Sequence, residues 1–98
     1  MNLLEKQTAA ATSDTFDLTG SNKSGVAEQT FRVIGSLGTD EYVTLYYHDG
    51  DDWRAAKMDG NDGKILDADN AVATVYGRMT DVRVSKSVTA TAVGVEVV

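Results

Sequence analysis

The chain lacks both cysteine and proline in its 98 residues. Without cysteine it has no disulfide bond, no thiolate nucleophile and no cysteine-bound metal. Without proline, the turns must rely on glycine and on Asp-Gly pairs. A chain of this length forms one domain with one thin core.

Long apolar runs are also missing. Residues 1–7 (MNLLEKQ) turn polar too early for a signal peptide. No run approaches the roughly 20 residues of a membrane helix. We therefore expect a protein made in a cytoplasm and no membrane partner.

Basic charge is scarce in the middle of the chain. Residues 40–69 hold nine acidic and three basic residues, so this stretch carries the whole net charge of −6. An acidic zone repels phosphate, and no basic patch lies elsewhere, so nucleic acid is not expected as a partner. Arg78, Arg83 and Lys86 give the last third a mildly basic character that could meet the acidic zone of a neighbouring subunit.

Valine and threonine together supply 23 residues, a composition typical of strands. Alternating patterns between turn segments predict about seven or eight short strands, and therefore a small antiparallel β-sandwich or barrel. The expected strands cover residues 15–19, 26–34, 41–48, 53–58, 64–66, 71–76, 81–86 and 88–98. In the last, the pattern changes phase around Gly94, which suggests a bulge there.

The most informative stretch is residues 41–58 (EYVTLYYHDGDDWRAAKM). It predicts a β-hairpin in which Val43, Leu45 and Tyr47 share one face. Asp49-Gly50 favours a type I′ turn, because glycine adopts positive φ without steric cost.

Residues 1–14 are expected to form an N-terminal arm, either extended or one helical turn, ahead of a β domain over residues 15–98. A helix here would be too short to be stable alone. Leu3 and Leu4 give the arm an apolar character, so it could bind a neighbouring protein by strand addition.

His48 beside Asp49 raises the question of catalysis. A nucleophilic triad also needs a positioned serine or cysteine, and no such motif is present. A histidine near a hairpin end is more often a solvated strand terminus. We therefore predict no catalytic residues.

The aspartate clusters at residues 49–52 and 59–63 raise the question of calcium. An EF-hand loop needs oxygen ligands at fixed positions and a glutamate at position 12. The second cluster instead places Gly63 at position 5 and Asn70 at position 12. Turn chemistry explains both clusters, and neither a metal nor another cofactor is predicted.

Tyr42, Tyr46, Tyr47 and Trp53 concentrate the aromatic residues in one hairpin. Three alternatives remain open for them: core packing or cover for the sheet, a protein interface, or stacking on sugar rings.

The stretch over residues 42–95 resembles small virion structural proteins of tailed bacteriophages. A strand and Asp-Gly turn leading to a tryptophan are followed by a tail of the form G…R.V.K..T…VGV. The residues that carry the resemblance are 42–45 (YVTL), Asp49-Gly50, Trp53, 65–70 (ILDADN), Gly77, 83–86 (RVSK), Thr89 and 93–95 (VGV).

This resemblance implies a non-enzymatic β domain located in the virion. Within that class we favour a capsid decoration, or cement, protein that binds the major capsid protein or other virion proteins and stabilises the head. It implies a homo-oligomer, with a trimer favoured. A neck or tail component and a carbohydrate-binding β module are the alternatives. The expected partner-binding residues are Leu3, Leu4, Tyr42, Tyr46, Trp53, Arg78 and Arg83.

Overall fold

The structure is a computed structural model that describes residues 2–18, 28–56, 63–76 and 79–98. Within these residues it holds ten strands and no helix, and every strand pair is antiparallel. The strands are β1 (Asn2–Gln7), β2 (Ala11–Thr12), β3 (Phe16–Leu18), β4 (Glu28–Ile34), β5 (Tyr42–His48), β6 (Trp53–Ala55), β7 (Lys64–Asp67), β8 (Val72–Tyr76), β9 (Met79–Lys86) and β10 (Val93–Val97).

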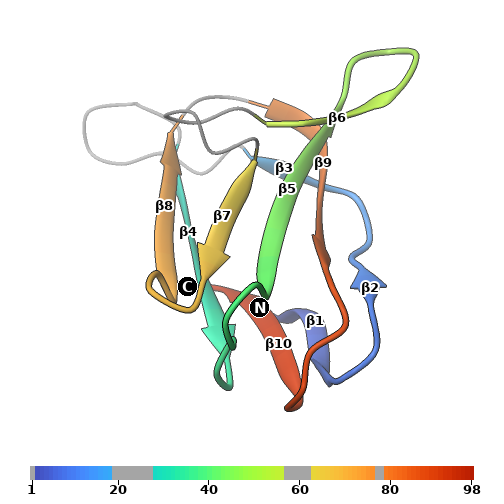
Figure 1. Cartoon of the computed structure of the whole chain (residues 1–98). Helices are drawn as coiled ribbons and strands as arrows, with labels where there is room; N and C mark the ends of the chain where they lie inside the picture. Colours follow the sequence, from blue (N-terminus) through green and yellow to red (C-terminus); the bar gives the residue numbers. More distant parts are fainter. Residues whose placement is uncertain (1, 19–27, 57–62, 77–78) are drawn as a thin grey trace.

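The strands form two sheets that enclose one core (Figure 1). The four-stranded sheet has the order β1-β10-β4-β8. In the six-stranded sheet β5 and β9 pair at the centre, β2 and β3 pair with β9, and β6 and β7 pair with β5. The prediction of a small antiparallel β-sandwich or barrel is confirmed, and of the two forms the structure takes the sandwich. The described residues form ten strands where about seven or eight were predicted.

The core is built from alternate residues of the central strands, as a period of two requires. On β5 the face with Val43 and Leu45 is fully buried, and Tyr47 packs partly against the core. Burial of each such aliphatic side chain contributes about 1.5–3 kcal/mol relative to exposure. The side chains with no exposed surface are Phe31, Val43, Leu45, Leu66, Val82, Val84, Val93 and Val95.

The N-terminal segment contributes one strand to each of the two sheets. β1 pairs with β10 and β2 pairs with β9, and Leu4 is 5% exposed within the core. Of the two expected conformations, extended or one helical turn, residues 2–7 take the extended one. Their strand pairing is made with the chain's own β10, because that strand offers both a backbone edge and an apolar surface for Leu4.

The last strand begins later than its valine pattern predicted. Residues 88–92 are not in β10, and their backbone is tied to loops: the N–H of Thr89 donates to the carbonyl of Thr8 at 2.9 Å. The register shifts of the β1–β10 ladder place the extra residues on β1, so the bulge expected at Gly94 lies on the opposite strand. A Cβ at Gly94 would lie 2.6 Å from the carbonyl oxygen of Leu4, and glycine therefore permits this close approach.

A candidate protein-interaction surface

An aromatic and basic group lies on the outer face of the six-stranded sheet. Tyr46 on β5 is opposite Arg83 on β9, and His48 on β5 is opposite Trp53 on β6. Facing residues of an antiparallel pair point to the same side, and the inner side of β5 is taken by Leu45 and Tyr47. We call the outward residues Tyr46, His48, Trp53 and Arg83 the Trp53 patch.

Arg83 is the centre of the Trp53 patch. Its guanidinium carbon lies 4.0 Å from the centroid of the Trp53 ring, which is a cation–π contact. The His48 ring meets the same indole edge-on, with centroids 5.2 Å apart. Arg83 Nε is buried without a hydrogen-bond partner. These contacts hold Arg83, His48 and Trp53 in one arrangement, and the side chains of the patch stay partly exposed.

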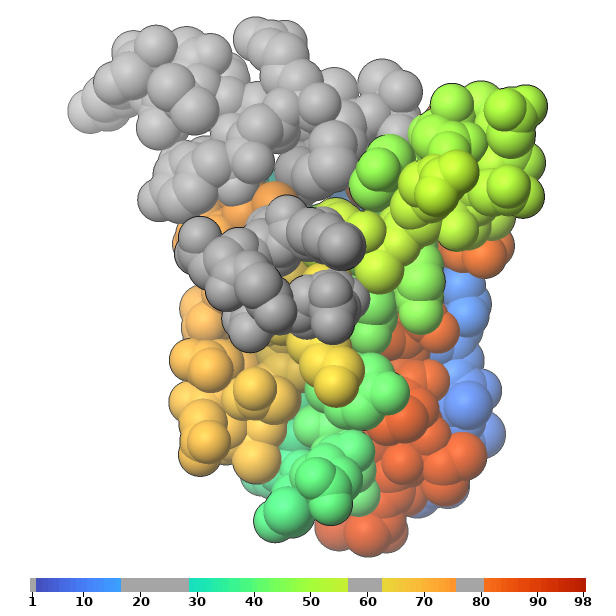
Figure 2. Space-filling view, turned by 45° about the horizontal axis from the view of Figure 1, so that its top comes forward, coloured from blue at the N-terminus to red at the C-terminus, as the bar shows by residue number. Residues whose placement is uncertain are grey.

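The loop beside the patch stands out from the body of the domain (Figure 2). Residues 49–52 connect β5 to β6, and the N–H of Asp49 donates to the carbonyl of Asp52 at 3.0 Å. The strands predicted on either side, residues 41–48 and 53–58, leave these same four residues between them. The predicted type I′ turn is wrong. That turn requires positive φ at both central residues, and of Asp49 and Gly50 only Gly50 adopts it, at 103°.

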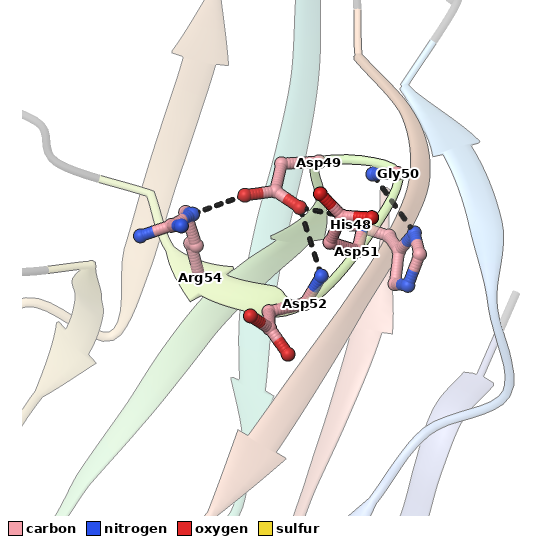
Figure 3. Close-up of polar contacts among 6 residues, drawn as sticks. All are labelled: His48, Asp49, Gly50, Asp51, Asp52 and Arg54. Atoms are coloured by element: carbon pink, nitrogen blue, oxygen red, sulfur yellow. Dashed lines mark hydrogen bonds and ion pairs between the residues drawn. The ribbon is translucent and has the colours of Figure 1, made fainter.

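The Asp49 carboxylate organises this loop (Figure 3). Its Oδ1 accepts the N–H groups of Asp51 and Asp52, each at 2.8 Å, and its Oδ2 pairs with Arg54. The hydrogen bond from Arg54, followed by those from the backbone of Asp52 and Asp51, holds the pKa of Asp49 far below its usual value. Asp49 makes these bonds rather than one to His48, whose Nδ1 accepts the N–H of Gly50 at 3.2 Å.

Tyr42 lies at the opposite end of β5 from the patch. It is paired with Asp67 on β7, and the Lys64 ammonium lies 4.4 Å from its ring centroid. A shallow groove of about 320 Å³ opens here, lined mostly by acidic and polar residues: Thr39, Asp40, Glu41, Tyr42, Lys64, Asp67, Ala68 and Asp69. Asp67 caps its own turn, since its Oδ1 accepts the N–H groups of Asp69 and Asn70.

The remaining expected partner-binding residues are dispersed. Leu3 is partly buried on β1 of the other sheet and lines a hollow of about 180 Å³ with Phe16. Leu4 is in the core. Arg78 lies outside the described residues, as does the cluster at 59–62. The structure thus brings together three of the seven residues: Tyr46, Trp53 and Arg83.

Glu41 and Lys86 form a polar cluster that joins the loops at the other end of the sandwich. The sequence analysis did not identify this cluster. The Glu41 carboxylate accepts the N–H of Gly38 at 2.8 Å and that of Ala90 at 2.9 Å. Lys86 is 2% exposed, and its ammonium donates to the carbonyl of Ala9 at 2.7 Å. The residue type gives no signal of this burial, because lysine side chains are usually exposed. The only signal in the sequence is the alternation within the strand, which places Lys86 on the same inward face as Val82 and Val84.

The pKa values of this cluster shift as its contacts require. The N–H groups of Gly38 and Ala90 lower the pKa of Glu41 against the opposing effect of burial, and the charge of Lys86 adds to them. Burial lowers the pKa of Lys86, while the charge of Glu41 opposes that shift.

Comparison of the chain with protein-family models, with curated proteins and with solved structures gave no match. Among the described residues, no group of three or more histidine, aspartate or glutamate side chains is arranged to hold a metal ion. The same part of the chain contains no helix long and apolar enough to cross a membrane.

Proposed function

We propose that this chain is a non-enzymatic structural protein of a tailed-phage virion, a decoration protein that binds and stabilises the head shell. The observation that supports the proposal is the Trp53 patch: an arginine and aromatic side chains held against one another on the outer face of a sheet. The family resemblance over residues 42–95 is the reason for proposing a virion protein, and the Trp53 patch is the surface that we propose binds the head shell.

A patch of this kind suits a protein partner. Tryptophan, tyrosine and arginine are the residues that most often contribute strongly to protein interfaces. An anchor already fixed by the Arg83–Trp53 contact loses less side-chain entropy on binding than a free one.

The patch suits a sugar less well. A sugar ring stacks on an open aromatic face, and the Arg83 guanidinium occupies one face of Trp53 while His48 contacts its ring. We therefore favour the virion role over a carbohydrate-binding module.

The 49–52 loop adds a charge preference to the surface. Asp49, Asp51 and Asp52 stand beside the patch, and Arg54 offsets the charge of Asp49. A partner surface with basic residues at the rim would be complementary, and charged rims mainly set encounter rate and orientation. Binding should therefore weaken with added salt.

The test is co-sedimentation with purified heads of the phage that encodes the chain, followed by electron microscopy of the decorated particle. Trp53→Ala and Arg83→Ala should each reduce the bound fraction, whereas Val88→Ala, at an exposed residue outside the patch, should not. Failure of the unaltered protein to bind heads, with density for it at the neck or tail, would reject the decoration role. Absence of the chain from the particle would reject the virion role altogether.

A further inference from the structure

Strand β8 forms an outer edge of the four-stranded sheet (Figure 1). Within the described part of the chain it pairs with β4 alone, and that ladder runs from Tyr76 to Val72 without a register shift. Its sequence, VATVY, contains no charge. A regular, uncharged edge is a template for pairing with another strand.

The other outer strands carry features that discourage such pairing. β1 has Glu5, Lys6 and two register shifts. β2, β3 and β6 have only two or three residues each, and β7 carries Lys64 and Asp67. Charge, irregularity and short length are three of the devices by which edges avoid association, and β8 has none of the three.

The hydrogen-bond pattern shows which groups of β8 face the open edge. The N–H of Val33 donates to the carbonyl of Ala71 at 2.9 Å. In an antiparallel ladder alternate residues make these bonds, so Ala73 and Val75 also direct their backbone groups toward β4. The N–H and C=O groups of Val72, Thr74 and Tyr76 therefore point away from the sheet.

We infer that the β8 edge binds a second copy of this chain, antiparallel, with the two-fold axis at Thr74. The N–H of each Thr74 then donates to the carbonyl of the other, and Val72 of each copy lies opposite Tyr76 of the other. Thr74 is the middle residue of the strand, so this register pairs its full length.

The second copy fits this edge better than an unrelated strand for two reasons. A two-fold interface requires only that the strand complement itself, and an uncharged strand sets no like charges opposite one another. The side chain of Val72, which is 55% exposed, also gains a cross-strand neighbour. The pairing joins the four-stranded sheets of two copies into one. It leaves the Trp53 patch, on the other sheet, free in both, so this inference is independent of the proposed function.

Sedimentation equilibrium of the intact chain should give a dimer that dissociates on dilution. Thr74→Lys should weaken the association severalfold, because it sets two ammonium groups directly opposite each other. Thr30→Lys is the matched control: Thr30 lies on the same outer face, hydrogen-bonded to Thr74, but one strand away from the edge. It should leave the dimer intact.

Cysteine cross-linking tests the register. The chain has no cysteine of its own, so an introduced cysteine can pair only with its copy in a second chain. Hydrogen-bonded antiparallel pairs have Cα atoms about 5.5 Å apart, within reach of a disulfide. Thr74→Cys should form a covalent dimer under mild oxidation, and Thr30→Cys should not. A monomer at every accessible concentration would overturn the inference. So would a trimer, or a dimer that Thr74→Lys leaves unchanged and Thr74→Cys fails to cross-link.

Discussion

The Lys86 ammonium donates a 2.7 Å hydrogen bond to the carbonyl of Ala9, which is 77 positions away in the sequence. This bond joins the end of β9 to the link between β1 and β2. The lysine is almost fully buried, and its charge has the Glu41 carboxylate as an opposite charge nearby.

Lys86→Met is expected to lower the free energy of unfolding by about 1 kcal/mol, because it keeps the aliphatic stem but removes the donor. Urea denaturation followed by circular dichroism measures the change. Lys64→Met, at an exposed lysine on the same sheet, is the control and should have a smaller effect. Equal losses in the two variants would show that the Lys86–Ala9 bond contributes nothing specific.

The Glu41 carboxylate predicts an acid-sensitive stability. Its pKa is lowered in the folded state from the usual 4.5 by the N–H groups of Gly38 and Ala90. A lowered carboxyl pKa contributes stability that is fully present above the unfolded value and is lost as the pH falls through the folded value. Glu41→Gln should therefore melt below the unaltered protein at pH 7, and the two should converge as the pH falls from about 4.5.

Differential scanning calorimetry at several pH values measures this convergence. Asp49 also loses bonds on acidification, but both proteins carry it, so its contribution cancels in the comparison. A melting difference that stays constant from pH 7 to pH 3 would exclude a role for the Glu41 charge.

The sequence predicted most of the strands because two signals agreed. Val, Leu and Phe alternate with polar residues within the strands, and glycine or aspartate lies between them. It did not predict β1 and β2, whose residues favour helix over strand as isolated sequence. Pairing with β10 and β9 decides their conformation, and local propensity carries no record of such partners.

Three residues of the Trp53 patch, Tyr46, Trp53 and Arg83, were among the partner-binding residues expected from the sequence, whereas His48 was not. Tyr46 and Trp53 were placed in one hairpin from the sequence. The position of Arg83 over Trp53 follows from β9 pairing with β5, a contact between distant segments. The same limit applies to Lys86 and Ala9. The Asp-Gly signal located the turn correctly but gave the wrong turn type, because the Asp49 side chain closes a four-residue loop by accepting two N–H groups.

The close approach of β1 to Gly94 predicts a large effect of a small substitution. Gly94→Ala would place a Cβ 2.6 Å from the carbonyl of Leu4 and 3.0 Å from the N of Lys6, both backbone atoms that cannot rotate away. The expected loss in unfolding free energy is about 1–3 kcal/mol.

Gly38→Ala is the matched control for Gly94→Ala. Its nearest neighbours are side-chain atoms of Glu41 at 3.4 Å, so the loss should stay within about 0.5 kcal/mol. Hydrogen exchange should also show faster exchange of β1 amides in Gly94→Ala alone. Protection of β1 equal to that of the unaltered protein would contradict the close packing of these strands.

The contact between Arg83 and Trp53 can be measured optically, because Trp53 is the only tryptophan. Arg83→Ala should shift its fluorescence emission to longer wavelength, since removal of the guanidinium exposes a ring face to water. The expected loss of stability is about 0.5–1 kcal/mol, the usual range for a partly exposed cation–π pair. Arg83→Lys, which keeps the charge without the planar group, should have an emission wavelength and a stability between those of the unaltered protein and of Arg83→Ala.

A double-mutant cycle with Trp53→Leu isolates the interaction of Arg83 with Trp53 from the other effects of each substitution. A coupling energy of zero, together with an unchanged emission spectrum in Arg83→Ala, would mean that the guanidinium does not rest on the indole in solution.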